Sequence, residues 1–142
     1  MALVVPNASE VIMLNYILNK DAPENISILL YANNVIPDEN STVATFTEVA
    51  NGLGYTTGGI SLTPGSWSVI SGNPSQAEHT EVTWTFTGAA GNVYGYYVTR
   101  ENGGELMWAE RFEKQAFNIK TAGDKIQITP RLTLRNKVEN VE

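Results

Sequence analysis

The chain has 142 residues, a formal net charge of −6 and a hydrophobic fraction of 42%. This length predicts one domain, residues 1–142, with a core large enough to fold without metal or disulfide staples. The absence of cysteine excludes disulfides, zinc–thiolate clusters and thiol nucleophiles. The acidic balance argues against nucleic acid as a partner, because phosphate binding depends on clustered lysine and arginine.

The N-terminal segment is apolar and ends at a proline. Leu3, Val4 and Val5 precede Pro6, so residues 1–6 are predicted to form an extended arm or a short edge strand. The segment lacks the basic region of a secretory signal, and no apolar run in the chain reaches the roughly 18–20 residues that span a bilayer. No membrane partner is therefore expected, and the charged residues 137–142 are predicted to be a flexible tail.

One helix is predicted directly after the arm. Asn7 is a suitable N-cap, Glu10 follows at the spacing of a capping box, and the helix is expected to continue to Leu18. Val11, Leu14 and Leu18 form one apolar stripe, and most of the remaining surface is apolar as well. Such a helix is expected to be buried nearly all round, either within the monomer or partly by a neighbouring subunit.

Short strands are predicted through the middle of the chain. Residues 26–31 are dense in β-formers, residues 42–49 alternate weakly as a short exposed strand would, and Trp67 and Val69 mark a third strand. The polar, turn-rich residues 33–41 predict a long connection. The alternation is cleanest in residues 80–87, where large apolar side chains point to one face and threonines to the other, which indicates a sheet with one solvated face.

Residues 93–112 predict a β-hairpin with a turn at residues 101–104, which contain two glycines. Strand periodicity places Tyr96 and Tyr97 on opposite faces of the first strand and places Leu106 on the same face as Trp108 in the second. Both faces carry large apolar groups. The hairpin is therefore expected to be covered on both sides, by a second sheet or by another subunit.

The last predicted strands include Phe117 and Ile119, and then residues 126–134, which Pro130 interrupts. Proline cannot donate to a sheet ladder, so Pro130 is expected at an edge or a bulge. About eight strands at this spacing predict an all-β chain, a β-sandwich of jelly-roll type with one short N-terminal α-helix. The predicted core contains Val82, Trp84, Phe86, Trp108 and Phe112.

No catalytic, cofactor or metal site is predicted. His79 lies between Glu78 and Glu81, as a general base paired with a carboxylate would, but no nucleophile motif accompanies it. A solvated polar stretch before a strand is the preferred interpretation of these residues. Asp38, Glu39 and Asn40 could contribute oxygens to calcium, but they lack the spacing and the glycine of an EF-hand, so a solvated loop is the preferred interpretation.

The aromatic residues of the hairpin have two further interpretations. A row of tyrosines with Trp108 suits the stacking of sugars, but aromatic residues at strand spacing more often belong to a core or an interface. The arm and the hairpin are therefore the candidate interface. Its candidate residues are Leu3, Val4, Val5, Tyr94, Tyr96 and Tyr97.

The order of several motifs resembles a group of small β-rich structural proteins of tailed bacteriophages. The motifs are VVPNASE at 4–10, ILLYANNVIPDENSTVATFTE at 28–48, GYTT at 54–57, SWSV at 66–69, VYGYYVT followed by LMWAERF in the hairpin, and GDKIQITPRLTL near the C-terminus. The resemblance covers roughly residues 3–134. It implies a protein that decorates the capsid as cement, or a component of the tail and its fibres, with no signature of catalytic residues.

The expected function is accordingly that of a capsid decoration protein, not of an enzyme. It is expected to bind across subunits of the major capsid protein as a homo-oligomer, a dimer or a trimer, on the capsid surface of the virion, after synthesis in the host cytoplasm. Two alternatives stay open. One is a tail, fibre or baseplate protein that contacts the host surface, and the other is a carbohydrate-binding β-sandwich.

Overall fold

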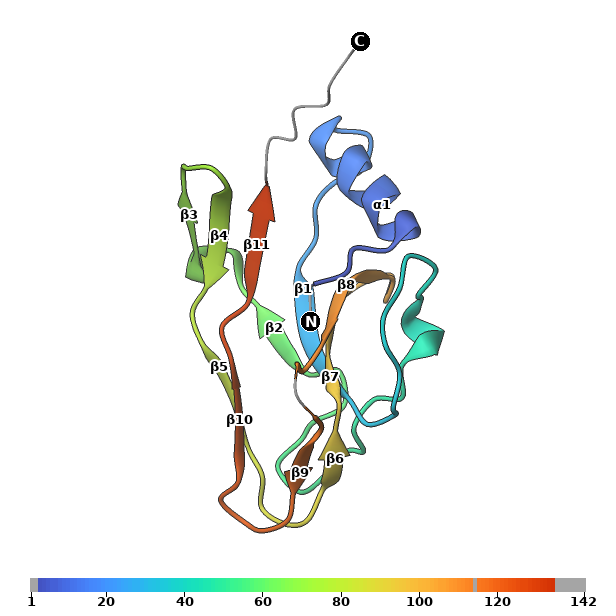
Figure 1. Cartoon of the computed structure of the whole chain (residues 1–142). Coiled ribbons are helices and arrows are strands. Elements are labelled where there is room, and N and C mark those ends of the chain that lie inside the picture. Colours follow the sequence, from blue (N-terminus) through green and yellow to red (C-terminus); the bar gives the residue numbers. More distant parts are fainter. Residues whose placement is uncertain (1–2, 114, 135–142) are drawn as a thin grey trace.

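The computed structural model describes residues 3–113 and 115–134 (Figure 1). Within these residues the chain forms one α-helix and eleven strands in several antiparallel sheets, so the prediction of a β-rich chain with one N-terminal helix is confirmed. The predicted tail, residues 137–142, lies outside the described residues, as do the first two residues of the predicted arm. The elements are α1 (Asn7–Ile17), β1 (Ile26–Tyr31), β2 (Ile60–Leu62), β3 (Trp67–Ile70), β4 (Ser75–His79), β5 (Val82–Thr85), β6 (Gly91–Val93), β7 (Gly95–Arg100), β8 (Leu106–Arg111), β9 (Phe117–Ile119), β10 (Lys125–Ile128) and β11 (Arg131–Leu134).

The largest sheet has four strands in the order β2-β1-β7-β8. The predicted hairpin supplies β7 and β8, and β1 lies against β7 with Leu30 opposite Tyr96. Strand β6 precedes β7 in the chain, and β9 follows β8. These two strands pair with each other, so they extend the hairpin at the end away from its turn. The turn between β7 and β8 closes where the Arg100 N–H donates to the carbonyl of Glu105.

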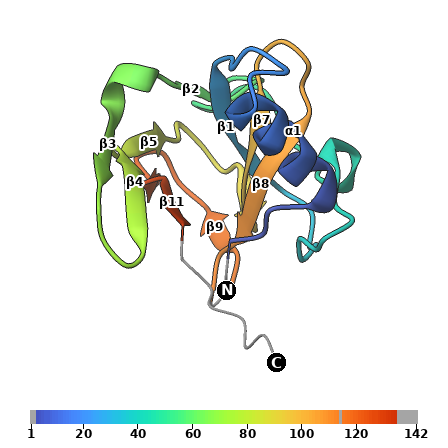
Figure 2. The same ribbon diagram turned by 90° about the horizontal axis from the view of Figure 1, so that it is seen from above.

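A second, bent ribbon runs beside this sheet. Strands β4 and β5 pair in turn with β11 and β10, and β3 adds to the outer side of β4. Pro130 lies at the bend between β10 and β11, where its carbonyl accepts the His79 N–H, so the proline separates two short strands. In Figures 1 and 2 the small sheet of β3, β4 and β11 lies on one side of the molecule and α1 on the other.

The main core forms between one face of the four-stranded sheet and the β5–β10 pair. Val82, Trp84 and Phe86 point into it, and the neighbouring threonines are exposed, as the alternation predicts. Trp108 is also buried in this core. Phe112, the fifth predicted core residue, is only partly buried and packs at its margin.

The other face of the hairpin is covered by the chain itself. Phe46, from the connection between β1 and β2, lies with its ring centroid 4.8 Å from that of Tyr31 and 4.9 Å from that of Tyr97. Leu106 and Ala109 belong to the same small cluster. Both faces of the hairpin are therefore covered, as expected, but the second face is covered by a loop of the same chain and not by a second sheet or another subunit.

A β-bulge changes the predicted pattern of β8. Val98 lies opposite Trp108 but Thr99 lies opposite Leu106, so Met107 is the extra residue. Met107 and Trp108 consequently both belong to the main core, and Leu106 belongs to the cluster on the other face. The prediction that Leu106 and Trp108 share a face is wrong because an inserted residue shifts the alternation by one.

Two local predictions are also corrected, and one strand was not predicted at all. Helix α1 begins at Asn7 with Pro6 as the N-cap and no side-chain capping bond, so Asn7 is not the cap. Residues 43–45 form a 3₁₀ turn where a strand was expected. Strand β4, Ser75–His79, was not predicted, because its polar sequence carries no apolar alternation. No described helix is long and apolar enough to cross a membrane.

Candidate assembly surfaces

Half of α1 faces solvent despite its apolar sequence. Its inner side, with Ile12 and Tyr16, packs against the main core, and Ser9 is buried where its hydroxyl donates to the carbonyl of Leu106. Its outer side carries four large apolar residues that are 56–77% exposed, and these define the helix surface. They are Val11, Leu14, Ile17 and Leu18.

The prediction that this helix is buried nearly all round is therefore wrong for the monomer. The stripe of Val11, Leu14 and Leu18 is the side that faces away from the core. Because the helix is apolar on all sides, its periodicity gave no indication of which side would be outermost. An exposed apolar side of this kind is typical of a surface that binds protein.

A second exposed apolar region lies at the end of the β3–β4–β11 sheet. Val69, Ala77 and Leu132 occupy one row across the three strands, so their side chains share a face. Val69 is 78% exposed and Leu134 is 82% exposed, and Ile70 is exposed at the end of β3. Val69 and Leu134 share this face and define the strand surface, whereas Ile70, the next residue along β3, points to the opposite face.

Strand β3 is also an edge strand. Edge strands are commonly protected by charged residues or proline, because their unpaired backbone groups bind other strands. The sequence of β3, Trp-Ser-Val-Ile, contains neither. The strand surface therefore combines apolar side chains with an unprotected edge, and the alternation of Trp67 and Val69 was its only signal in the sequence.

The predicted arm is part of the sheet. The Val4 N–H donates to the carbonyl of Ala109 at 2.8 Å, and the Ala109 N–H donates back to Val4 at 3.0 Å. Leu3 and Val5 are partly buried against the main core. The three candidate residues Leu3, Val4 and Val5 thus cover the edge of β8 within the monomer.

The three candidate tyrosines have different positions. Tyr96 is 4% exposed and Tyr97 is 3% exposed, each within a core cluster, so neither presents its ring at the surface of the monomer. Tyr94 is half-buried, and the guanidinium of Arg111 lies 5.3 Å from the centre of its ring. Arg111 also donates to Asn34 Oδ1 at 2.7 Å, which holds the 32–49 connection against the hairpin.

A partly buried cation, Arg100, which no sequence motif indicates, connects α1 to the hairpin turn. Arg100 Nη2 donates to Glu24 Oε2 at 3.2 Å, and the guanidinium lies 5.7 Å from the centre of the Tyr16 ring. Arg100 Nε forms ion pairs with Glu24 Oε1 at 3.2 Å and with Glu105 Oε2 at 3.6 Å. This nitrogen makes no hydrogen bond to either carboxylate. The bond from Arg100 lowers the pKa of Glu24 below its ordinary value.

His79 is buried, which corrects its interpretation as part of a solvated stretch. It ends β4 with 4% of its surface exposed and lies edge-on to Trp67, with the two ring centroids 5.2 Å apart. Its Nδ1 is 2.7 Å from the carbonyl oxygen of Thr80, and Glu78 bonds instead to Arg131 at 2.6 Å. No described carboxylate is hydrogen-bonded to this histidine.

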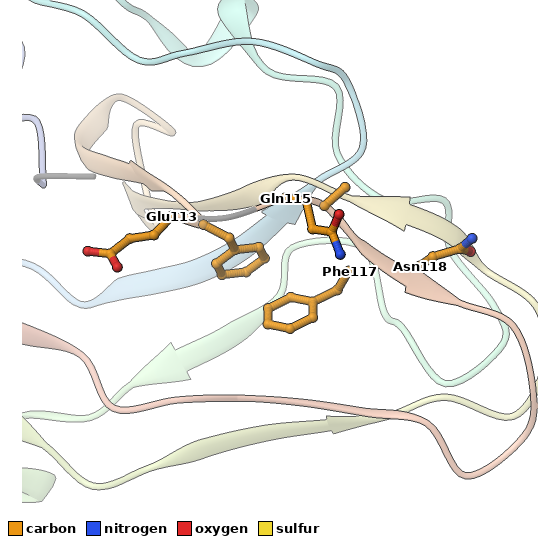
Figure 3. Close-up of a pocket in the computed structure, with 6 residues that line it drawn as sticks. Glu113, Gln115, Phe117 and Asn118 are labelled. Atoms are coloured by element: carbon orange, nitrogen blue, oxygen red, sulfur yellow. The ribbon is translucent and has the colours of Figure 1, made fainter.

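The connection between β8 and β9 lines a shallow pocket of about 530 Å³ (Figure 3). The rings of Phe112 and Phe117 lie 4.7 Å apart, centre to centre, in an edge-on arrangement. In Figure 3 the side chains of Glu113 and Asn118 extend in opposite directions away from Phe117. Small-molecule sites usually have several polar groups that converge on the ligand, whereas of the polar side chains labelled in Figure 3 only that of Gln115 points toward Phe117.

Within residues 3–113 and 115–134, no group of three or more histidine, aspartate or glutamate side chains is placed to hold a metal ion. No known protein family, no curated protein and no solved structure matches the chain.

Proposed function

We propose that this chain is a structural protein of a virion, a capsid decoration protein that binds across subunits of the major capsid protein. The order of its sequence motifs supports this proposal, through their resemblance to small structural proteins of tailed bacteriophages. The chemistry of its surface supports it as well. A decoration protein needs apolar surface for protein partners, and binding to the assembled shell adds directly to the stability of that shell.

The observation that carries the proposal is the strand surface. Val69 and Leu134 are among the most exposed large apolar side chains described; Val69 lies on the unprotected edge strand β3, and Leu134 lies on β11 at the other edge of the same small sheet. Such a sheet can add a strand from another protein by backbone hydrogen bonds, with the apolar side chains giving specificity. The shell protein is the partner that we assign to this surface.

The proposed fold class is a β-sandwich of jelly-roll type. Support comes from the main core, to which one face of the four-stranded sheet and the β5–β10 pair both contribute side chains. The antiparallel pairing throughout and the bend at Pro130 are also compatible with this class. The proposal assigns no catalytic role to His79 or to any other residue.

The test is binding to empty shells assembled from the major capsid protein. The protein is expected to co-sediment with shells, and Val69→Glu is expected to weaken binding at least about tenfold, because it places a charge in an apolar contact. Thr83→Glu is the matched control, since Thr83 is exposed on β5, away from the strand surface. Equal binding by the Val69→Glu variant, or no binding by the parent protein, would contradict the proposal.

A tail, fibre or baseplate role is the second candidate, because the same surface chemistry serves any virion assembly. Binding to purified tails in place of shells would support this candidate. A carbohydrate-binding role has less support. Tyr96 and Tyr97 are buried, and the polar side chains of Glu113 and Asn118 do not converge beside Phe117.

A further inference from the structure

The outer side of α1 is complementary to itself under a two-fold rotation. Residues 11–19 contain no charged residue, whereas Glu10 lies before them and Lys20 after them. Both charged residues are exposed, and neither forms an ion pair with another described residue. The helix surface is thus an apolar stripe with an acid at one end and a base at the other.

The end of the helix fixes the position of the base. The N–H of Asn19 donates to the carbonyl of Tyr16, and the N–H of Lys20 donates to the carbonyl of Asn15. Asn19 has a φ of 55°, so these bonds form the left-handed termination that commonly ends helices. Lys20 is therefore held at the C-terminal end of α1 and not on a separate loop.

We propose that the helix surface binds the helix surface of a second copy of this chain, with the two helices antiparallel. Leu14 then lies next to the two-fold axis, and Val11 packs against Leu18 of the second copy. Glu10 of each copy approaches Lys20 of the other, which gives two equivalent ion pairs at the rim. The partner is thus specified by charge complementarity as well as by apolar area.

A parallel arrangement is disfavoured by the same charges. It would bring Glu10 close to Glu10 and Lys20 close to Lys20, and it would align the two helix dipoles side by side. The antiparallel arrangement removes both repulsions. Four apolar side chains per copy bury less than the roughly 1,200–2,000 Å² of a standard interface, so the dimer is expected to be weak in dilute solution.

The pairing is independent of binding to the shell. It uses the helix surface and leaves the strand surface for the shell, and in Figure 2 the β3–β4–β11 sheet that carries the strand surface lies on the other side of the molecule from α1. Either proposal can therefore fail while the other stands. A variant that stays monomeric but still binds shells would separate the two.

Cross-linking tests the geometry directly, because the chain has no native cysteine. Helices packed 8–10 Å apart bring the Cα atoms of residues beside the axis to about 3.5–5.5 Å, which overlaps the range that a disulfide spans. The Leu14→Cys variant is expected to form disulfide-linked dimers at least about tenfold faster than the Thr83→Cys variant. Leu14 is 56% exposed, so this substitution leaves the core intact.

A charge exchange tests the register. Glu10→Lys alone and Lys20→Glu alone are each expected to weaken dimerisation about tenfold, measured by sedimentation at high protein concentration and by the rate of Leu14→Cys cross-linking. The double variant, with both residues exchanged, is expected to restore it. Equal cross-linking at positions 14 and 83, or no recovery in the double variant, would overturn the proposal.

Discussion

Tyr96 donates a hydrogen bond of 2.9 Å from its hydroxyl to Glu110 Oε1, and the two residues lie directly opposite each other on β7 and β8. The tyrosine is 4% exposed, so this bond holds a charged acceptor at the margin of the main core. Burial, and then the nearby charge of Glu110, raises the pKa of Tyr96 far above its ordinary value. The bond joins the two strands of the hairpin on which the rest of the chain packs.

The buried tyrosines predict how stability depends on alkaline pH. Burial raises the pKa of Tyr31 and of Tyr97 to about 12, and raises that of Tyr55 and Tyr96 further. The unfolded chain loses these protons near pH 10 while the folded chain keeps them, so the free energy of unfolding should fall as pH rises from 10 to about 12.

A phenolate absorbance titration checks this prediction. In the folded protein, the five tyrosines whose pKa is raised should ionise only above pH 10, together with unfolding, and all six tyrosines of the chain should titrate near pH 10 in denaturant. Six tyrosines that titrate near pH 10 without loss of structure would contradict the packing described.

Arg100 should be more important for stability than the exposed Arg131. The Arg100→Met variant removes the charged partner of Glu24, which keeps its bond from the Asn102 N–H, whereas Arg131 pairs with Glu78 in solvent, where ion pairs contribute little. Because the folded pKa of Glu24 is lowered, its contribution is present above the ordinary pKa of a glutamate and is lost as pH falls below it.

Chemical denaturation at neutral and at acidic pH measures both effects. The Arg100→Met variant should unfold at a lower denaturant concentration than the parent at neutral pH, and the difference should shrink in acid. The Arg131→Met variant should match the parent throughout. Equal midpoints for the two variants at neutral pH would show that the Arg100 cluster does not connect α1 to the turn.

Gly95 is required where β7 passes the ring of Tyr31. A Cβ at this position would lie 2.6 Å from the Tyr31 hydroxyl oxygen and would also collide with the backbone carbonyl of Glu110. Gly95→Ala should therefore cost about 1–3 kcal/mol in the free energy of unfolding. Gly65→Ala is the matched control, because Gly65 has no atom within 4 Å of a new Cβ, and it should change stability by less than about 1 kcal/mol.

Trp84 should be one of the most sensitive positions of the core. It is 4% exposed on β5, so Trp84→Ala should lower the free energy of unfolding by about 3–5 kcal/mol. Thr83→Ala, on the exposed face of the same strand, should change it by no more than about 0.5 kcal/mol. Equal denaturation midpoints for the two variants would contradict the orientation of β5.

The strands whose sequences are dense in β-formers or alternate strictly between apolar and polar residues were predicted well. Strand β1 has the predicted bounds, and the strict alternation from Val82 to Thr87 gives the correct inner and outer faces of β5. Periodicity succeeds here because one side of each strand must be apolar and because no residue is inserted.

The remaining features depend on tertiary structure that periodicity does not encode. The extra residue Met107 reverses the faces within β8, and strand β4 forms from polar residues because β3 and β11 pair with it on both sides. The outer side of α1 could not be predicted, since all its sides are apolar. Of the candidate interface, Tyr96 and Tyr97 are in the core, and the strand surface is found only once the sheet is assembled.

The central claim is that this protein decorates the head of a virion. The most direct measurement is labelling of the protein on intact virions with gold-conjugated antibody fragments, viewed by electron microscopy. The account predicts label over the whole head, at many copies per particle, and loss of that label when virions are assembled with the Val69→Glu variant. Label confined to the tail, or virions without label, would contradict it.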